Sequence, residues 1–135
     1  MKRIFLFILA VLMWATATVS AQSTDQYLSQ LKASIMSADA VGIAGQTMNS
    51  VEIVQFGEGR FYSRGQATLL LKGFFKDYPP DNFKIMASTK SSGGWFVEGV
   101  YSPKQSTAKL KIYIRMRVAE GGWKIREFMI ERVDE

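Results

Sequence analysis

The sequence contains no cysteine and no histidine. Without cysteine, the chain has no disulfide, no thiol nucleophile and no cysteine-based metal site. Without histidine, it lacks the commonest general base, the Ser-His-Asp and Cys-His catalytic arrangements and most zinc sites. Phosphate-binding spacings such as GxGxxG and GxxxxGK(S/T) are absent as well. We therefore expect no metal and no cofactor, and any catalysis would depend on carboxylates, tyrosine, lysine or arginine.

Long hydrophobic runs are scarce too, and the one that stands out lies near the N-terminus, at residues 4–15. The basic segment Met1-Lys2-Arg3 precedes it and the small residues Val19-Ser20-Ala21 follow it, which is the pattern of a secretory signal peptide. The run is short for a membrane span, which needs ~20 residues. A retained single-pass anchor is the alternative. We expect cleavage after Ala21, so that residues 1–21 are a signal peptide and residues 22–135 form a single domain.

Export and a small excess of positive charge limit the partners that we expect. The sequence has 17 Lys and Arg against 12 Asp and Glu, and loss of Lys2 and Arg3 with the signal peptide leaves a net charge of +3. So small an excess argues for solubility and weak attraction only. We expect the mature chain to be periplasmic or secreted, to have no membrane span and not to bind nucleic acid.

Two helices are predicted before the first strand. Ser23 and Gln26 have the spacing of a capping box, and apolar residues recur at helical spacing from Leu28 to Ile35. Asp39 can cap a second, short helix that extends to Met48.

The clearest helix is predicted at residues 63–78. Ser63 and Gln66 form a second capping box, and the apolar residues from Ala67 to Tyr78 lie on one stripe. Pro79-Pro80 must end this helix, because proline lacks an amide hydrogen and disfavours helical geometry in the residue before it. Strands are predicted at residues 51–56, 83–89, 95–102, 106–118 and 123–133, and the short connections between the last four indicate an antiparallel meander.

Cations and aliphatic residues alternate along residues 107–118, so this strand should show which face of the sheet is buried. Lys109, Lys111, Arg115 and Arg117 share one parity, and the aliphatic residues have the other. We interpret the basic row as the solvated face of the sheet. An anion-binding patch that combines Lys109 and Arg117 with Lys124 and Arg126 of the last strand is the alternative.

The pairing of the last two strands requires one extra residue. If Val118 pairs with Trp123, an unbroken register places Glu127 against Ile114 on the buried face, at a cost of several kcal/mol. A β-bulge at Arg126-Glu127 removes this conflict. With the bulge, Ile114 pairs with Phe128, Ile112 with Ile130, Arg115 with Glu127 and Lys111 with Glu131.

Several stretches of the sequence stand out together: residues 60–67 (RFYSRGQA), the Leu69-Leu70, Phe74-Phe75 and Pro79-Pro80 pairs, the KLKIYI strand and the GGWKI hairpin. In this order they resemble a family of small exported bacterial domains of unknown function with the nuclear transport factor 2-like, or cystatin-like, fold. The resemblance covers roughly residues 26–133. It implies a cone-shaped α+β domain in which a strongly curved, mostly antiparallel sheet wraps around the long helix. The N-terminal helices would close one side and leave a pocket between helix and sheet.

The resemblance also suggests where a site would lie. Enzymes of this superfamily place a carboxylate inside the cone, and Glu98 is the candidate here. If Tyr101 pairs with Thr107, Glu98 faces inward and could act as a general base, with Tyr62 as hydrogen-bond donor. A shift of one residue places Glu98 outside, beside Lys111, which is the arrangement we favour. We expect the pocket to be lined by Leu70, Phe74, Phe96, Ile112, Ile114 and Phe128.

Three functions are compatible with this sequence. We predict a non-catalytic binding module whose partner is a small apolar molecule or an envelope protein. A cofactor-free isomerase or lyase that uses Glu98 is the second possibility, because the superfamily includes both enzymes and non-catalytic proteins. The third is a structural protein whose pocket is filled by its own side chains and which forms a homodimer through an exposed sheet face.

Overall fold

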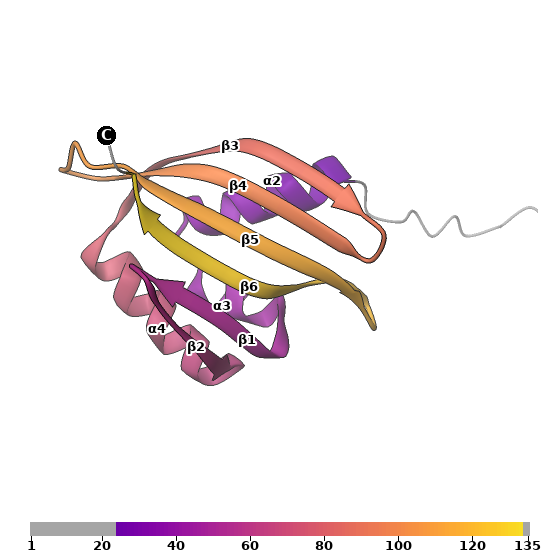
Figure 1. Cartoon of the computed structure of the whole chain (residues 1–135). Coiled ribbons are helices and arrows are strands. Elements are labelled where there is room, and N and C mark those ends of the chain that lie inside the picture. The colour runs from indigo at the N-terminus through magenta and orange to yellow at the C-terminus, as the bar shows by residue number, and fades with distance from the viewer. Residues whose placement is uncertain (1–23, 134–135) are drawn as a thin grey trace, which may run out of the picture.

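The structure, a computed structural model, describes residues 24–133 and contains one six-stranded sheet with helices on its inner face (Figure 1). The order of the strands in the sheet is β2-β1-β6-β5-β4-β3. β1 pairs with β6 in parallel, and the other neighbours are antiparallel. The elements are α2 (Thr24–Met36), α3 (Ala40–Gly45), β1 (Thr47–Gln55), β2 (Glu58–Ser63), α4 (Arg64–Asp77), β3 (Pro80–Ser91), β4 (Gly94–Pro103), β5 (Leu110–Ala119) and β6 (Gly122–Arg132).

The expected signal peptide at residues 1–21 and the helix cap at Ser23 lie outside the described residues. Within residues 24–133, no helix is both long enough and apolar enough to span a membrane.

The ends of α4 follow the local sequence as predicted. The Gln66 backbone N–H donates to Ser63 Oγ at 3.2 Å, and the Ser63 backbone N–H donates to Gln66 Oε1 at 3.0 Å, which completes the capping box. At the other end, the Tyr78 N–H donates to the Phe74 carbonyl, and Pro79 prevents a further turn.

The second helix is shorter than predicted. Asp39 caps it by accepting a hydrogen bond from the Gly42 N–H at 2.9 Å, but α3 ends at Gly45 instead of continuing to Met48. The Thr47 hydroxyl donates to the Ala44 carbonyl at 2.6 Å and so satisfies an acceptor at the helix end. The chain then turns directly into β1.

The sequence-based prediction missed β2. Residues 58–63 are almost all exposed, because β2 is an edge strand that packs little apolar surface. Its sequence therefore lacks the alternation by which the other strands were recognised. The turn before it is centred on Phe56 and Gly57, which both have positive φ (51° and 87°), as a two-residue hairpin loop requires.

The predicted bulge in β6 is confirmed. Val118 pairs with Trp123 and Met116 with Ile125, and the next pair is Arg115 with Glu127, so Arg126 is the extra residue. The four other predicted pairs are also present: Ile114 with Phe128, Ile112 with Ile130, Arg115 with Glu127 and Lys111 with Glu131.

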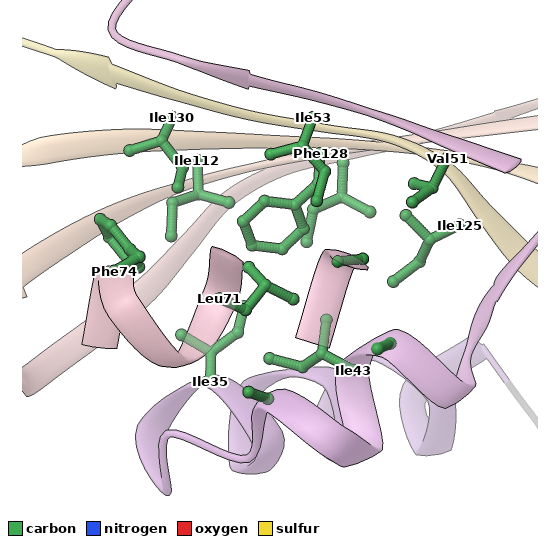
Figure 2. Close-up of a cluster of buried hydrophobic side chains, with 14 of the residues drawn as sticks. Ile35, Ile43, Val51, Ile53, Leu71, Phe74, Ile112, Ile125, Phe128 and Ile130 are labelled. Atoms are coloured by element: carbon green, nitrogen blue, oxygen red, sulfur yellow. The ribbon is translucent and has the colours of Figure 1, made fainter. Parts of the chain in front are cut away.

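The buried apolar side chains of β5 and β6 face the helices and fill the interior. Figure 2 shows Ile112, Phe128 and Ile130 pointing from the sheet toward α4, where Leu71 and Phe74 point back at them. Ile112 and Ile114 are 0% exposed and Phe128 is 1% exposed. Val51 and Ile53 of β1, with Ile35 of α2 and Ile43 of α3, complete this core (Figure 2).

Single-residue deletions in β6 test the bulge. Deleting Arg126 removes the extra residue and leaves Ile114 opposite Phe128, so the chain should still fold. Deleting Met129 instead turns Ile130 outward and Glu131 inward, which should cost at least about 3 kcal/mol more. Urea unfolding of both variants measures the difference. Equal losses, or a larger loss for the Arg126 deletion, would contradict the assigned register.

A second prediction concerns Tyr101, which is fully buried and donates a hydrogen bond to the Tyr78 carbonyl. Burial raises the pKa of Tyr101 because the phenolate loses its hydration. The unfolded chain then releases this proton near pH ~10 while the folded chain keeps it, so the free energy of unfolding should fall as the pH rises above ~10, by up to ~1.4 kcal/mol per pH unit. Urea unfolding between pH 8 and 11 measures this slope. Tyr101→Phe should have a shallower slope, and identical slopes would exclude Tyr101 as the cause.

Candidate functional site

A cleft of about 370 Å³ lies at the edge of the sheet where β1 and β2 meet α4. We call it the β2 cleft. Strand residues supply most of its walls, and α4 contributes one aliphatic side chain. The residues that line it are Ile53, Gln55, Phe56, Glu58, Arg60, Tyr62 and Leu70.

The alternation of β2 brings its functional side chains to one face. Glu58, Arg60 and Tyr62 are two residues apart, so they point to the same side of the strand. Their partners on β1 are Gln55, Ile53 and Val51 respectively. Because Ile53 faces the helices (Figure 2), the three β2 side chains also lie on the inner side of the sheet, toward α4.

Phe56 forms the rim of the cleft in a strained backbone conformation. A bulky residue with φ of 51° is rare and costs of order 1–3 kcal/mol, so its surroundings must hold it in place. The guanidinium of Arg132 lies 4.2 Å from the centroid of its ring, and the ring of Tyr78 lies 5.7 Å away. These contacts fix the Phe56 ring at the end of the cone.

The cleft holds two opposite charges that do not pair with each other. Glu58 and Arg60 are exposed, and neither has a hydrogen bond or ion pair through its side chain within residues 24–133. Arg64 is the contrast, because its Nε and Nη2 both donate to the Thr47 carbonyl, at 3.1 and 2.9 Å. Arg64 thus serves the fold, whereas the Arg60 guanidinium and the Glu58 carboxylate are free to bind a ligand.

The six residues predicted to line a pocket lie in three different places. Phe74, Ile112, Ile114 and Phe128 are at most 2% exposed and pack against one another and their neighbours in the core. Leu70 is half-buried and lines the β2 cleft, as does Tyr62. The space between α4 and the middle of the sheet is thus occupied by the protein's own side chains.

Phe96 lies on the opposite face, and its predicted position in a pocket is wrong. β4 pairs with β5 so that Tyr101 meets Leu110, and the buried residues of β4 are then Trp95, Val97, Gly99, Tyr101 and Pro103. Phe96 therefore faces outward, where its ring stacks on Tyr113 at 5.9 Å.

Glu98 is also on the outer face, as the favoured register predicted. Its carboxylate lies 3.4 Å from the ammonium of Lys111. The hydrogen bond to Glu98, followed by the nearby Tyr113, raises the pKa of Lys111. The inward alternative fails because Thr107 precedes β5 and does not pair with Tyr101. Glu98 and Tyr62 are thus on opposite faces and cannot act on one substrate.

The sequence did not single out most of the cleft. Gln55 and Phe56 end a strand that the sequence predicts, but no pattern assigns them to a cleft, and Glu58 and Arg60 lie between that strand and the helix cap at Ser63, where the sequence predicts no strand. The usable signal was the spacing of two residues between Glu58, Arg60 and Tyr62, which would place them on one face of a strand but is too short and too polar to indicate a strand by itself. No group of acidic side chains within residues 24–133 could hold a metal ion.

Residues 28–131 match a protein family described as a domain of unknown function, DUF4783. The chain belongs to this family. A DUF4783 protein of known structure from Bacteroides uniformis is 13% identical, with a TM-score of 0.71 over 78% of this chain and 95% of that chain. One from Bacteroides ovatus is 14% identical, with a TM-score of 0.72 over 78% and 94%.

An NTF2-like protein with a cystatin-like fold, from Novosphingobium aromaticivorans, is 12% identical, with a TM-score of 0.58 over 79% of this chain and 77% of that chain. No curated protein matches the chain. At such identities these likenesses concern the fold alone. They confirm the nuclear transport factor 2-like α+β architecture that the resemblance in the sequence implied.

Proposed function

We propose that the mature DUF4783 domain is an exported, non-catalytic binding module that holds a small molecule in the β2 cleft. The observation that carries this proposal is the presence, in one cleft of about 370 Å³, of an unpaired guanidinium and an unpaired carboxylate beside apolar walls. Small-molecule sites typically have volumes of ~300–1,000 Å³ and a few polar groups among apolar ones. Arg60 and Glu58 are the polar groups, and Ile53 and Leu70 are the apolar ones.

The interior of the domain supports binding without catalysis. A general base must be held near the reacting atom, and its pKa is usually perturbed by burial or charge. Apart from Tyr101 and the Trp95 indole, whose N–H donates to Ser88 Oγ, Thr47 is the one buried polar side chain among residues 24–133, and its hydroxyl donates to the Ala44 carbonyl. The carboxylate considered for an isomerase or lyase, Glu98, lies outside with Lys111.

The packed core also argues for the cleft over an interior site. An apolar ligand between α4 and the sheet would have to displace side chains such as Phe74 and Phe128, which are 2% and 1% exposed. Opening such a core costs several kcal/mol per displaced aromatic side chain. We therefore propose a ligand that enters from the rim and reaches the polar groups of β2.

Native mass spectrometry of protein purified from the cell envelope tests this function. We expect a chain that begins at Gln22 and carries a non-covalently bound small molecule. That molecule, added to isotope-labelled protein, should shift the NMR signals of Tyr62 and Leu70 and leave those of Glu98 and Lys111 unchanged. A full-length chain would contradict export, and shifts confined to the outer face would contradict the cleft as the site.

The outer face of the sheet favours a second function, self-association. Acidic residues lie on β1 and on the second half of β6, and basic residues lie on β5, with Lys124 at the start of β6 opposite Arg117. Apart from Glu98 of β4, which pairs with Lys111, the face thus has a negative and a positive side. A two-fold axis along the boundary of β5 and β6 would place the negative side of one copy on the positive side of the other. The acidic residues are Glu52, Glu127 and Glu131, the basic ones are Lys111, Arg115 and Arg117, and Phe61, Phe96, Tyr113 and Met129 are apolar neighbours.

Sedimentation velocity tests the homodimer. Arg115→Glu places a negative charge opposite the partner's acidic side and should shift the protein to a monomer, and Arg115→Glu with Glu127→Arg should restore the dimer. Lys72→Glu makes the same change in charge at an exposed position of α4, away from the outer face of the sheet, and should leave the dimer intact. A wild-type monomer at high concentration would exclude this second function.

A further inference from the structure

We propose that the β2 cleft binds peptides of two residues as zwitterions, with the terminal carboxylate on Arg60 and the terminal ammonium on Glu58. This inference rests on the proposed small-molecule function of the cleft and specifies the class of ligand. It depends on the spacing of the two charges, on their freedom from other partners and on the apolar surface between β1 and α4.

The spacing of the two side chains matches the length of a dipeptide. Glu58 and Arg60 are two residues apart on a strand, so their Cα atoms are separated by ~6.6 Å. An extended chain of two residues spans at most ~7 Å. The two ends of a dipeptide can therefore meet the carboxylate and the guanidinium at the same time. A single amino acid carries both charges on one carbon and cannot reach both groups without bending them together.

The chemistry of each group fits one end of the peptide. A guanidinium offers a planar fork of donors that binds a carboxylate through two parallel hydrogen bonds. A glutamate carboxylate accepts hydrogen bonds from an ammonium group. Arg60 and Glu58 have no competing partner through their side chains in the described part of the chain, so neither must give up an existing contact. A simple anion would bind Arg60 but meet the like charge of Glu58.

The other residues of the cleft suit the middle of a dipeptide. Gln55 and Tyr62 provide an amide and a hydroxyl within the same cleft, which can pair with a peptide group. Ile53 and Leu70 provide apolar surface for a side chain, and the Phe56 ring, fixed by Arg132 and Tyr78, limits the cleft at one end. A cleft of this kind should prefer an aliphatic or aromatic side chain to a charged one.

Calorimetric titration with four related probes tests the inference. Leucyl-leucine carries both end charges, its N-acetyl form lacks the ammonium, leucyl-leucinamide lacks the carboxylate, and leucine has both charges at too short a spacing. We expect leucyl-leucine to bind at least about tenfold more tightly than each of the other three, because hydrogen bonds to charged groups contribute ~1.5–3 kcal/mol. Equal binding of the dipeptide and its two blocked forms would overturn the inference.

Two substitutions test which side chain binds each end of the peptide. Arg60→Gln should reduce the preference for leucyl-leucine over leucyl-leucinamide to near unity, and Glu58→Gln should do the same for its preference over the N-acetyl form. Lys72→Gln and Glu120→Gln make the same charge changes at exposed positions outside the cleft and should leave both ratios unchanged. If the controls alter the ratios as much as the cleft variants do, the two end contacts are wrong.

The test separates this inference from the proposed function. If leucyl-leucine fails to bind while another small molecule shifts the NMR signals of Tyr62 and Leu70, the dipeptide class is wrong and the cleft remains a ligand site. If no small molecule shifts those signals, both proposals are wrong.

Discussion

The extra residue at Arg126 is the constraint on which the rest of the structure depends. Side chains alternate between the two faces of a strand, so a single-residue error in β6 exchanges its inner and outer residues. With the bulge, Phe128 and Ile130 lie opposite Ile114 and Ile112 on the inner face. Glu127 then lies opposite Arg115 on the outer face. One local irregularity thus separates an apolar interior from a charged exterior.

The position of the candidate site follows from that register. β6 is the central strand that pairs with both β5 and β1, and it places Ile53 of β1 beside Phe128. β1 in turn positions β2, where Arg60 pairs with Ile53. The middle of the sheet is covered by helices and packed with aliphatic and aromatic side chains, whereas at this edge polar side chains of β2 line a cleft. The unpaired charges of Glu58 and Arg60 therefore lie at this rim of the cone.

The sequence predicted the parts of the fold that are governed by strong periodic patterns. The capping box at Ser63, the stop at Pro79 and the alternation of β5 and β6 each have one low-energy solution, and all three are present. The register of β4 was harder to predict, because the loop before Leu110 has no regular sequence pattern. Phe96 and Glu98 could therefore be placed on either face of the sheet. The prediction placed Glu98 correctly and Phe96 incorrectly, although residues two apart on one strand must share a face.

The candidate site was less predictable than the fold for a physical reason. An edge strand such as β2 buries little surface, so selection for packing leaves no alternating apolar pattern in its sequence. Whether a cone is hollow or filled depends on the volumes of side chains from five or more elements, which periodicity does not report. The filling of the interior by Phe74 and Phe128 could therefore be seen only in three dimensions.

The most direct test of this account is the set of nuclear Overhauser contacts made by the methyl groups of Ile114. The account predicts strong contacts with the ring protons of Phe128 and none with the side chain of Glu127. Strong contacts between Ile114 and Glu127 would show that β5 and β6 pair without the bulge. They would contradict both the packed apolar interior and the position of the β2 cleft.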